Sequence, residues 1–318
     1  MLSRDELERH QVWIYLFAIG LGLILGATWG SADTLEALLW PVLGLLLFVT
    51  FTQVPLLHVS SAFRDIRFMS AVLIGNFVAI PVVVAVLVWF LPVDPVLRLG
   101  VVMVLLMPCT DWYITFTHLS RGDTGRAIAV TPVNLLVQIA LLPAYLWAFM
   151  GNSFHEILAA GPVATVFVTL ILVPLLAAWL VEWWAARSRP RPRIIEAMGW
   201  MPVPLLALVV FLIAASQAQT VFGSLPLLMG ATPVFVVFLI ASVGLGLGVS
   251  RAVGMGTEQA RALIMSYATR NSFVMLPLAL ALPSEWRGAT VVIVHQSLIE
   301  LLGILVLLWL LPRLTRAT

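Results

Sequence analysis

The chain contains no lysine and a single cysteine, and only 10% of its 318 residues are charged. One cysteine excludes an intramolecular disulfide. A soluble protein of this length needs far more charge to stay dissolved, whereas 62% of this chain is hydrophobic. We therefore predict an integral membrane protein whose main partner is the lipid bilayer. The formal net charge of +2 is too small to indicate a nucleic-acid partner.

Long apolar runs occur along the whole sequence. A helix needs about 20 mostly apolar residues to cross the hydrocarbon core. Such runs are centred on residues 12–30, 36–57, 69–91, 97–118, 126–150, 158–184, 201–218, 231–250, 259–282 and 288–312. The polar start is followed by a run long enough to span, which indicates an uncleaved first helix rather than a signal peptide. The fold class that we expect is an all-α membrane protein with ten transmembrane helices.

The positions of the arginines predict how the chain is oriented. Most of the 17 arginines fall on one side of the expected spans, namely Arg4, Arg9, Arg64, Arg67, Arg121, Arg126, Arg187, Arg189, Arg191, Arg193, Arg251, Arg261, Arg313 and Arg316. Arg98 and Arg287 fall on the other side, and Arg270 lies inside a span. The positive-inside rule therefore places both termini in the cytoplasm of a bacterial-type cytoplasmic (inner) membrane.

An arginine-rich linker divides the chain into five helices and five. Residues 1–184 hold helices 1–5 of a first repeat together with helix 6 of a second, residues 185–200 form the cytoplasmic linker, and residues 201–318 hold helices 7–10. An odd number of spans forces the second half to enter the membrane from the opposite side. We therefore expect two inverted five-helix repeats within a single membrane domain.

Two expected spans are interrupted at corresponding places in the two halves. Helix 4 contains PCTD, residues 108–111, and helix 9 contains ATRNS, residues 268–272. Pro108 has no N–H and clashes with the preceding turn, so the helix breaks there. Backbone freed at membrane depth persists only where it is buried in protein or lines a wet cavity. Paired, crossing interruptions of this kind are typical of a transporter site.

The two breaks and the helices that follow them supply the candidate site residues. The residues expected to bind substrate are Cys109, Thr110, Asp111, Arg270, Asn271 and Ser272. Asp111 and Ser272 are expected to cap the second halves of their helices. Each following helix carries a polar pair spaced i, i+4 on one face. These pairs, which with Asp111 and Arg270 form the expected coupling network, are Asn134 with Gln138 and Gln296 with Glu300.

Each candidate also has a purely structural interpretation. Cys109 could be a small packing residue, and Asp111, Arg270 and Glu300 could form a structural ion network. Asn134, Gln138 and Gln296 could be hydrogen-bonding contacts between helices. An intramembrane enzyme would need a nucleophile with its base or a metal cluster, and the sequence contains neither HExxH nor GxSxG. We expect a transporter without a cofactor.

Several stretches resemble the bile acid, arsenite and riboflavin transporter superfamily. They are FTQVPLLHVSSAFRDIRF at 51–68, GNFVAIP at 75–81, PCT followed by LSRGD, and SYATRNSF at 266–273. PCT and ATRNSF resemble the arsenite efflux permease branch, in which the helix 4 cysteine is implicated in handling As(III); carried over, that role falls on Cys109. That branch usually has an acid just after the RNxF stretch, where this chain has Val274, so Asp111 is expected to supply the carboxylate.

The resemblance implies a secondary transporter that exports arsenite or a related metalloid by proton antiport. The alternative is a sodium- or proton-coupled carrier of organic anions, like the bile acid symporters. The sodium sites of that branch use Ser and Asn after the helix 4 break, where this chain has Tyr113 and Ile114. They use Glu and Gln around the helix 9 break, where it has Ser266 and Arg270. A fixed guanidinium repels sodium, so we favour the arsenite branch.

Overall fold

The chain folds into helices packed around a common interior. The structure, a computed structural model, describes residues 4–28, 32–58, 65–110, 112–151, 162–187, 198–223 and 225–315, and within these ranges it forms helices and no strand. Seven of the described helices are long and apolar enough to cross a membrane. The prediction of an all-α, multi-pass membrane protein is therefore confirmed.

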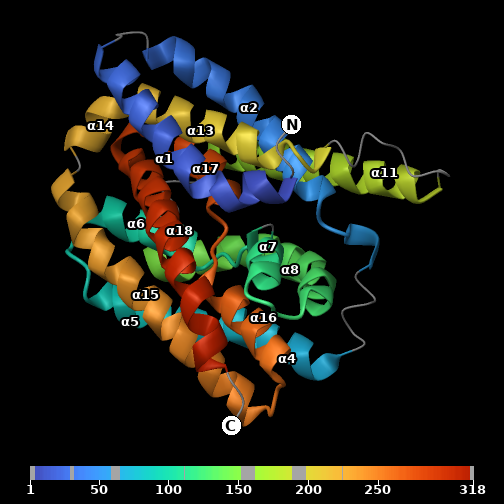
Figure 1. Cartoon of the computed structure of the whole chain (residues 1–318). Helices are drawn as coiled ribbons and strands as arrows, with labels where there is room; N and C mark the ends of the chain where they lie inside the picture. Colours follow the sequence, from blue (N-terminus) through green and yellow to red (C-terminus); the bar gives the residue numbers. More distant parts are fainter. Residues whose placement is uncertain are drawn as a thin grey trace.

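A first helix group lies side by side in the upper part of the molecule (Figure 1). It consists of α1 (Arg4–Thr28), α2 (Ala32–Thr52), α11 (Val173–Arg187) and α13 (Pro202–Ser216). A short α10 (Pro162–Val166) and a π-helical segment, η3 (Phe167–Leu172), lead directly into α11. The 3₁₀ turn η1 (Leu56–His58) packs on α11, and α14 (Ala218–Gly223) contacts helices of both groups.

A second helix group contains both interrupted helices. Its first half consists of α4 (Ile66–Ile74), the π-helical segment η2 (Gly75–Ala79), α5 (Ile80–Trp89), α6 (Pro95–Leu105), α7 (Trp112–Leu119) and α8 (Thr124–Met150). Its second half consists of α15 (Leu225–Ala252), α16 (Thr257–Ala268), α17 (Ser272–Leu280), the 3₁₀ turn η4 (Ser284–Trp286) and α18 (Gly288–Leu314). α18 packs against α6, α15 and α17 and runs diagonally through Figure 1.

The observed helices differ from the expected spans at three places. The expected span at 97–118 divides into α6 and α7, and the span at 259–282 divides into α16 and α17. The span at 201–218 is the short helix α13, which ends at Ser216. For this reason these three spans are not among the seven long helices, and the ten-span inverted repeat stays a prediction. Residues 188–197 of the expected linker lie outside the described residues.

Aspartate side chains fix where several helices of the second group begin. Asp65, Asp94 and Asp123 each accept a backbone N–H three residues further on, at the starts of α4, α6 and α8. Such caps satisfy N–H groups that have no partner within the helix. The backbone hydrogen bond from Phe68, together with the guanidinium of Arg126, lowers the pKa of Asp65 below its ordinary value. These polar starts mark the ends of the apolar helices.

Candidate functional site

The two helix breaks lie directly against each other. Pro108 and Arg270 face one another in an isolated antiparallel bridge. The N–H of Cys109 donates to the carbonyl of Thr269 at 3.1 Å, and the N–H of Asn271 donates to the carbonyl of Met107 at 2.8 Å. Each break thus satisfies backbone groups that the other break leaves without helical partners. The sequence-based prediction of two interruptions that meet agrees with this geometry.

The guanidinium of Arg270 is held by acceptors from three helices. Its Nη2 donates to Oδ1 of Asn76 at 2.9 Å and to the carbonyls of Ser266 and Tyr267 at 2.8 and 2.9 Å. Its Nη1 donates to the carbonyl of Leu105, the last residue of α6, at 3.3 Å. Because the last carbonyls of a helix carry partial negative charge, they stabilise a cation. Only 2% of Arg270 is exposed.

A π-helical segment brings Asn76 to this guanidinium. Asn76 lies within η2, and its amide also donates to Oγ of Ser266 at 2.8 Å. Gly75 lies so close to Tyr267 that a Cβ would come within 1.9 Å of the phenol oxygen. Neither Asn76 nor Tyr267 was among the predicted site residues. The sequence did contain a signal for Asn76, since it is the only residue with an amide side chain in the apolar stretch 66–89.

Glu300 and Gln296 connect α18 to the second break. Oε2 of Glu300 accepts the backbone N–H of Arg270 at 3.0 Å and the Nε2 of Gln296 at 2.6 Å. Oε1 of Gln296 accepts the hydroxyl of Ser272 at 3.1 Å. All four residues are buried. The predicted i, i+4 pair on α18 therefore faces the break, and its carboxylate binds Arg270 through the backbone.

Asn271, rather than Ser272, caps the second half of helix 9. Oδ1 of Asn271 accepts the N–H of Val274 at 3.3 Å, and Ser272 is already the first residue of α17. The prediction that Ser272 caps this helix was wrong because Asn271 occupies the preceding position and has an acceptor at the right reach. The amide of Asn271 also donates to Oγ1 of Thr110 at 3.2 Å. The two breaks are thus joined by side chains as well as by backbone.

Cys109 is buried at the junction of the breaks. Only 1% of it is exposed, and it lies within electrostatic range of the Arg270 guanidinium. Asp111, two residues further on, lies outside the described residues, so its pairing with Arg270 stays a prediction. Within the described ranges, no group of three or more His, Cys, Asp or Glu residues could hold a resident metal ion.

The polar pair on α8 is buried without hydrogen-bond partners in the described part of the chain. Asn134 and Gln138 are both completely buried, and both atoms of each amide have no partner there. An amide buried in this way is unfavourable by about 1–3 kcal/mol. Such groups are therefore candidates for binding a polar solute or water. α8 packs against both α7 and α16, which flank the breaks.

A narrow hollow lies between the two helix groups, next to the breaks. Tyr15 of α1 and Leu206 of α13 line one wall, and Trp112 of α7 and Phe273 of α17 line the other. The Trp112 ring stacks on Tyr15 with centroids 5.9 Å apart and meets Phe273 edge-on at 4.8 Å. Since Trp112 and Phe273 lie in the first turns of the second halves of the broken helices, an opening between the groups at this hollow would expose the breaks.

Comparisons with known proteins agree with this arrangement. A model of the sodium bile acid symporter family matches residues 40–224, which is more than half of the chain. The chain is also similar to the arsenical-resistance protein Acr3 of Corynebacterium glutamicum, at 31% identity over 87 residues. That similarity covers 27% of this chain and 24% of the relative, so the matched segment spans about a quarter of the relative's length.

Proposed function

This chain belongs to the sodium bile acid symporter family and is a membrane transporter of that family, and on this premise we propose that it exports arsenite by exchange with protons. In this proposal the two crossed breaks form the substrate site. Cys109, Thr110, Asp111, Asn271 and Ser272 contact the substrate, and Arg270 provides a fixed positive charge. Both termini lie in the cytoplasm, and transport runs outward across the cytoplasmic membrane.

The position of Cys109 carries this proposal. The only cysteine of the chain lies in the break of helix 4, within electrostatic range of a buried guanidinium, and its backbone N–H is hydrogen-bonded to the break of helix 9. Soft thiolate ligands suit soft metalloids, and a neighbouring positive charge favours the thiolate. A single thiol also suits a carrier, because a cage of three thiolates would hold arsenic too tightly to release. The similarity to Acr3 supports the same substrate.

Proton coupling is proposed to depend on Arg270 and a carboxylate. Nε of Arg270 has no hydrogen-bond partner among the described residues, although Nη1 and Nη2 are engaged. Asp111 follows Cys109 by two residues, and Cys109 lies in the break that faces Arg270. In this proposal the Asp111 carboxylate therefore accepts a hydrogen bond from Nε of Arg270. Binding to the guanidinium favours the charged carboxylate, and release into an apolar gap favours the protonated form. Movement of Asp111 between these surroundings would load and release a proton.

Arsenite tolerance tests the role of Cys109. In cells that lack their own arsenite efflux pump, the wild-type chain should restore growth, and Cys109→Ser should abolish this protection at an unchanged protein level. Adding Ser242→Cys to that variant places a thiol at another buried position, on α15, and should not restore tolerance. Full protection by Cys109→Ser would show that the thiol only packs.

The hollow between the helix groups favours a second candidate, a carrier of organic anions. Its walls are mostly apolar and aromatic, which suits the body of an amphipathic anion, but its volume is only about 10 Å³, so the two helix groups must separate to admit one. Arg270, in the adjoining break, would then suit the charge of the anion. In that case a labelled bile acid would enter vesicles down a sodium or proton gradient. Trp112→Ala would then weaken bile acid uptake while Cys109→Ser left it intact. The absence of bile acid uptake under either gradient would exclude this candidate.

A further inference from the structure

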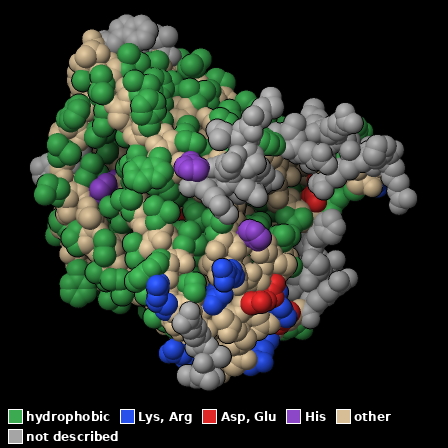
Figure 2. Space-filling model, in the orientation of Figure 1, with side chains coloured by type: hydrophobic (Ala, Val, Ile, Leu, Met, Phe, Trp, Pro, Cys, Tyr) green, Lys and Arg blue, Asp and Glu red, His purple; other side chains and the backbone are tan. Residues whose placement is uncertain are grey.

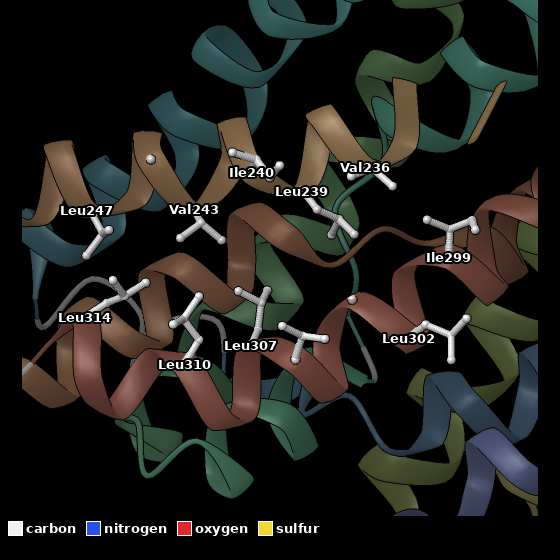
Figure 3. A pocket seen from close by; sticks show the side chains of 13 residues that line it. Val236, Leu239, Ile240, Val243, Leu247, Ile299, Leu302, Leu307, Leu310 and Leu314 are labelled. Atoms are coloured by element: carbon white, nitrogen blue, oxygen red, sulfur yellow. The ribbon is translucent and has the colours of Figure 1, made fainter. Parts of the chain in front are cut away.

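An apolar groove runs along the outer surface between α15 and α18 (Figure 3). Its volume is about 660 Å³, and all of its lining residues are apolar. Val236, Ile240 and Leu247 line it from α15, and Leu302 and Leu314 line it from α18. Both helices are long enough to span a membrane. The groove is therefore in a position to contact the lipid phase.

Two glycines shape the groove, one by leaving space in it and one by letting the two helices approach each other. Gly244 of α15 has no atom within 4 Å of the place where its Cβ would be, so a larger side chain there would project into the groove. On the opposite wall, a Cβ on Gly303 would lie 2.4 Å from the side chain of Leu239, which therefore packs where that Cβ would stand. The two helices thus approach each other closely without filling the space between them.

The length of the groove corresponds to one leaflet. It follows α15 from Val236 to Leu247 for about 16 Å and α18 from Ile299 to Leu314 for about 22 Å, at about 1.5 Å of rise per residue. Half of the hydrocarbon core of a bilayer is about 15 Å thick. An extended acyl chain that enters from one membrane surface and ends near the midplane therefore matches this groove.

Arginines stand at one end of the groove, on the helix faces that line it. Arg251 follows Leu247 by four residues on α15, and Arg313 follows Leu310 by three residues on α18, so the helical period places both above the lining residues. Both arginines are exposed. Figure 2 shows arginine side chains gathered at the end of the molecule where the C-terminus lies, beyond a largely apolar surface.

We propose that this groove binds an anionic phospholipid, with one acyl chain between α15 and α18 and the phosphate on Arg251 and Arg313. An apolar groove with positively charged side chains at one end is complementary to a negatively charged amphiphile. A transported polar solute would find no polar lining here. A second copy in the same membrane orientation would bring the arginine ends of both copies together, and like charges repel each other.

Native mass spectrometry of the full chain tests this site with phosphatidylglycerol, and with phosphatidylcholine as the neutral probe. The wild-type chain should retain phosphatidylglycerol in preference to phosphatidylcholine. Arg251→Gln and Arg313→Gln should each weaken retention about fivefold, which corresponds to the attraction of one arginine near an anionic surface. Gly244→Leu, which fills the groove, should abolish retention of the bound lipid.

Two matched controls separate this site from general lipid adhesion. Gly248 has the same open space at its Cβ as Gly244 but does not line the groove, so Gly248→Leu should retain the lipid. Arg187 stacks on Trp183 as Arg313 stacks on Trp309, with 3.6 Å to the ring centroid in both, so Arg187→Gln should also retain it. Equal retention in every variant would overturn the proposal, as would equal binding of both lipids. A dimer lost in Gly244→Leu would instead identify the groove as an interface between copies.

Discussion

At the scale of single residues, the burial of Arg270 determines what surrounds it. Removing a lone charge from water is unfavourable by several kcal/mol even after the protein relaxes. Here the guanidinium contacts three backbone carbonyls and one amide oxygen, and the ring of Phe238 lies 5.4 Å away. Because the carbonyl oxygens belong to α6 and α16 and the amide oxygen to η2, hydrogen bonds from three helical segments stabilise the charge of Arg270. The arginine therefore holds α6, α16 and the π-helical segment η2 together around the breaks.

Loss of the amide at Asn76 should destabilise the fold through Arg270. Asn76→Leu keeps a similar volume but removes an acceptor from a buried cation, so we expect a loss of about 1–3 kcal/mol in the free energy of unfolding. Asn76→Asp keeps the acceptor and should lose less. Thermal unfolding of the purified chain in detergent measures both variants. Unchanged stability of Asn76→Leu would contradict the role of this contact.

Some of these residues could be identified from the sequence, and others could not. Cys109, Thr110, Arg270 and Asn271 stand out because polar residues interrupt spans that are otherwise apolar. The guanidinium's partners were missed because most of them are backbone carbonyls, which every residue carries. The sequence also gave no reason to choose Asn271 over its neighbour as the helix cap, because both side chains can accept a hydrogen bond.

At the scale of helices, η2 shows how a π-helical segment serves the site. Helices of this kind carry an extra residue per turn and occur often at functional positions. The segment Gly75–Ala79 turns Asn76 toward Ser266 and Arg270, and Gly75 allows the Tyr267 ring to pass directly over the backbone. The Tyr267 hydroxyl then donates to the carbonyl of Ala71 at 2.5 Å. α4 is thereby fixed to α16.

A methyl group at Gly75 should disrupt this contact. The added Cβ of Gly75→Ala would lie 1.9 Å from the phenol oxygen of Tyr267, so the ring or the helix must move. Overpacking of this kind is unfavourable by about 1–3 kcal/mol or more. Thermal unfolding should show the loss, whereas Gly20→Ala, with open space at its Cβ, should not. Adding Tyr267→Leu to Gly75→Ala should recover part of the stability; a Gly75→Ala variant as stable as wild type would contradict the close approach.

Helix positions could be predicted better than the way in which the breaks pair. The long apolar runs gave spans near the observed helices because about 20 apolar residues are needed in hydrocarbon. The break at 108–111 followed from proline, which cannot continue a helix. The bridge between Pro108 and Arg270 depends on atoms more than 150 residues apart, and no local pattern specifies such a contact.

At the scale of the whole molecule, the breaks lie in one helix group and face the other. α1 contacts α18, and α2 contacts α17. The aromatic hollow lies between α1 and α13 of the first group and α7, α17 and α18 of the second. Within the second group, the backbone bridge and the Arg270 contacts tie the broken helices together. Movement of this group against the first, with the hollow opening to either side in turn, would give a bound solute alternating access.

The orientation proposed from the arginines predicts which side of the membrane each loop faces. In a Cys109→Ala background, Ser188→Cys in the linker should react with an impermeant maleimide in inverted vesicles and not in intact spheroplasts. Ser284→Cys, at the exposed turn between α17 and α18, should show the reverse. Labelling of both positions from the same side would contradict the ten-span topology.

Transport of arsenite by inverted membrane vesicles tests the proposed function most directly. The vesicles hold either wild-type chain, Cys109→Ser or Arg270→Gln, and the interior is made acidic with sodium absent. We predict that wild-type vesicles accumulate arsenite when the pH gradient is imposed and that both variants are inactive. A sodium gradient imposed in a separate assay should have no effect on wild-type accumulation. Accumulation that follows a sodium gradient without a pH gradient would contradict proton-coupled arsenite export and favour the carrier of organic anions, whereas proton-driven accumulation that persists in Cys109→Ser would contradict the role of the thiol as a substrate contact.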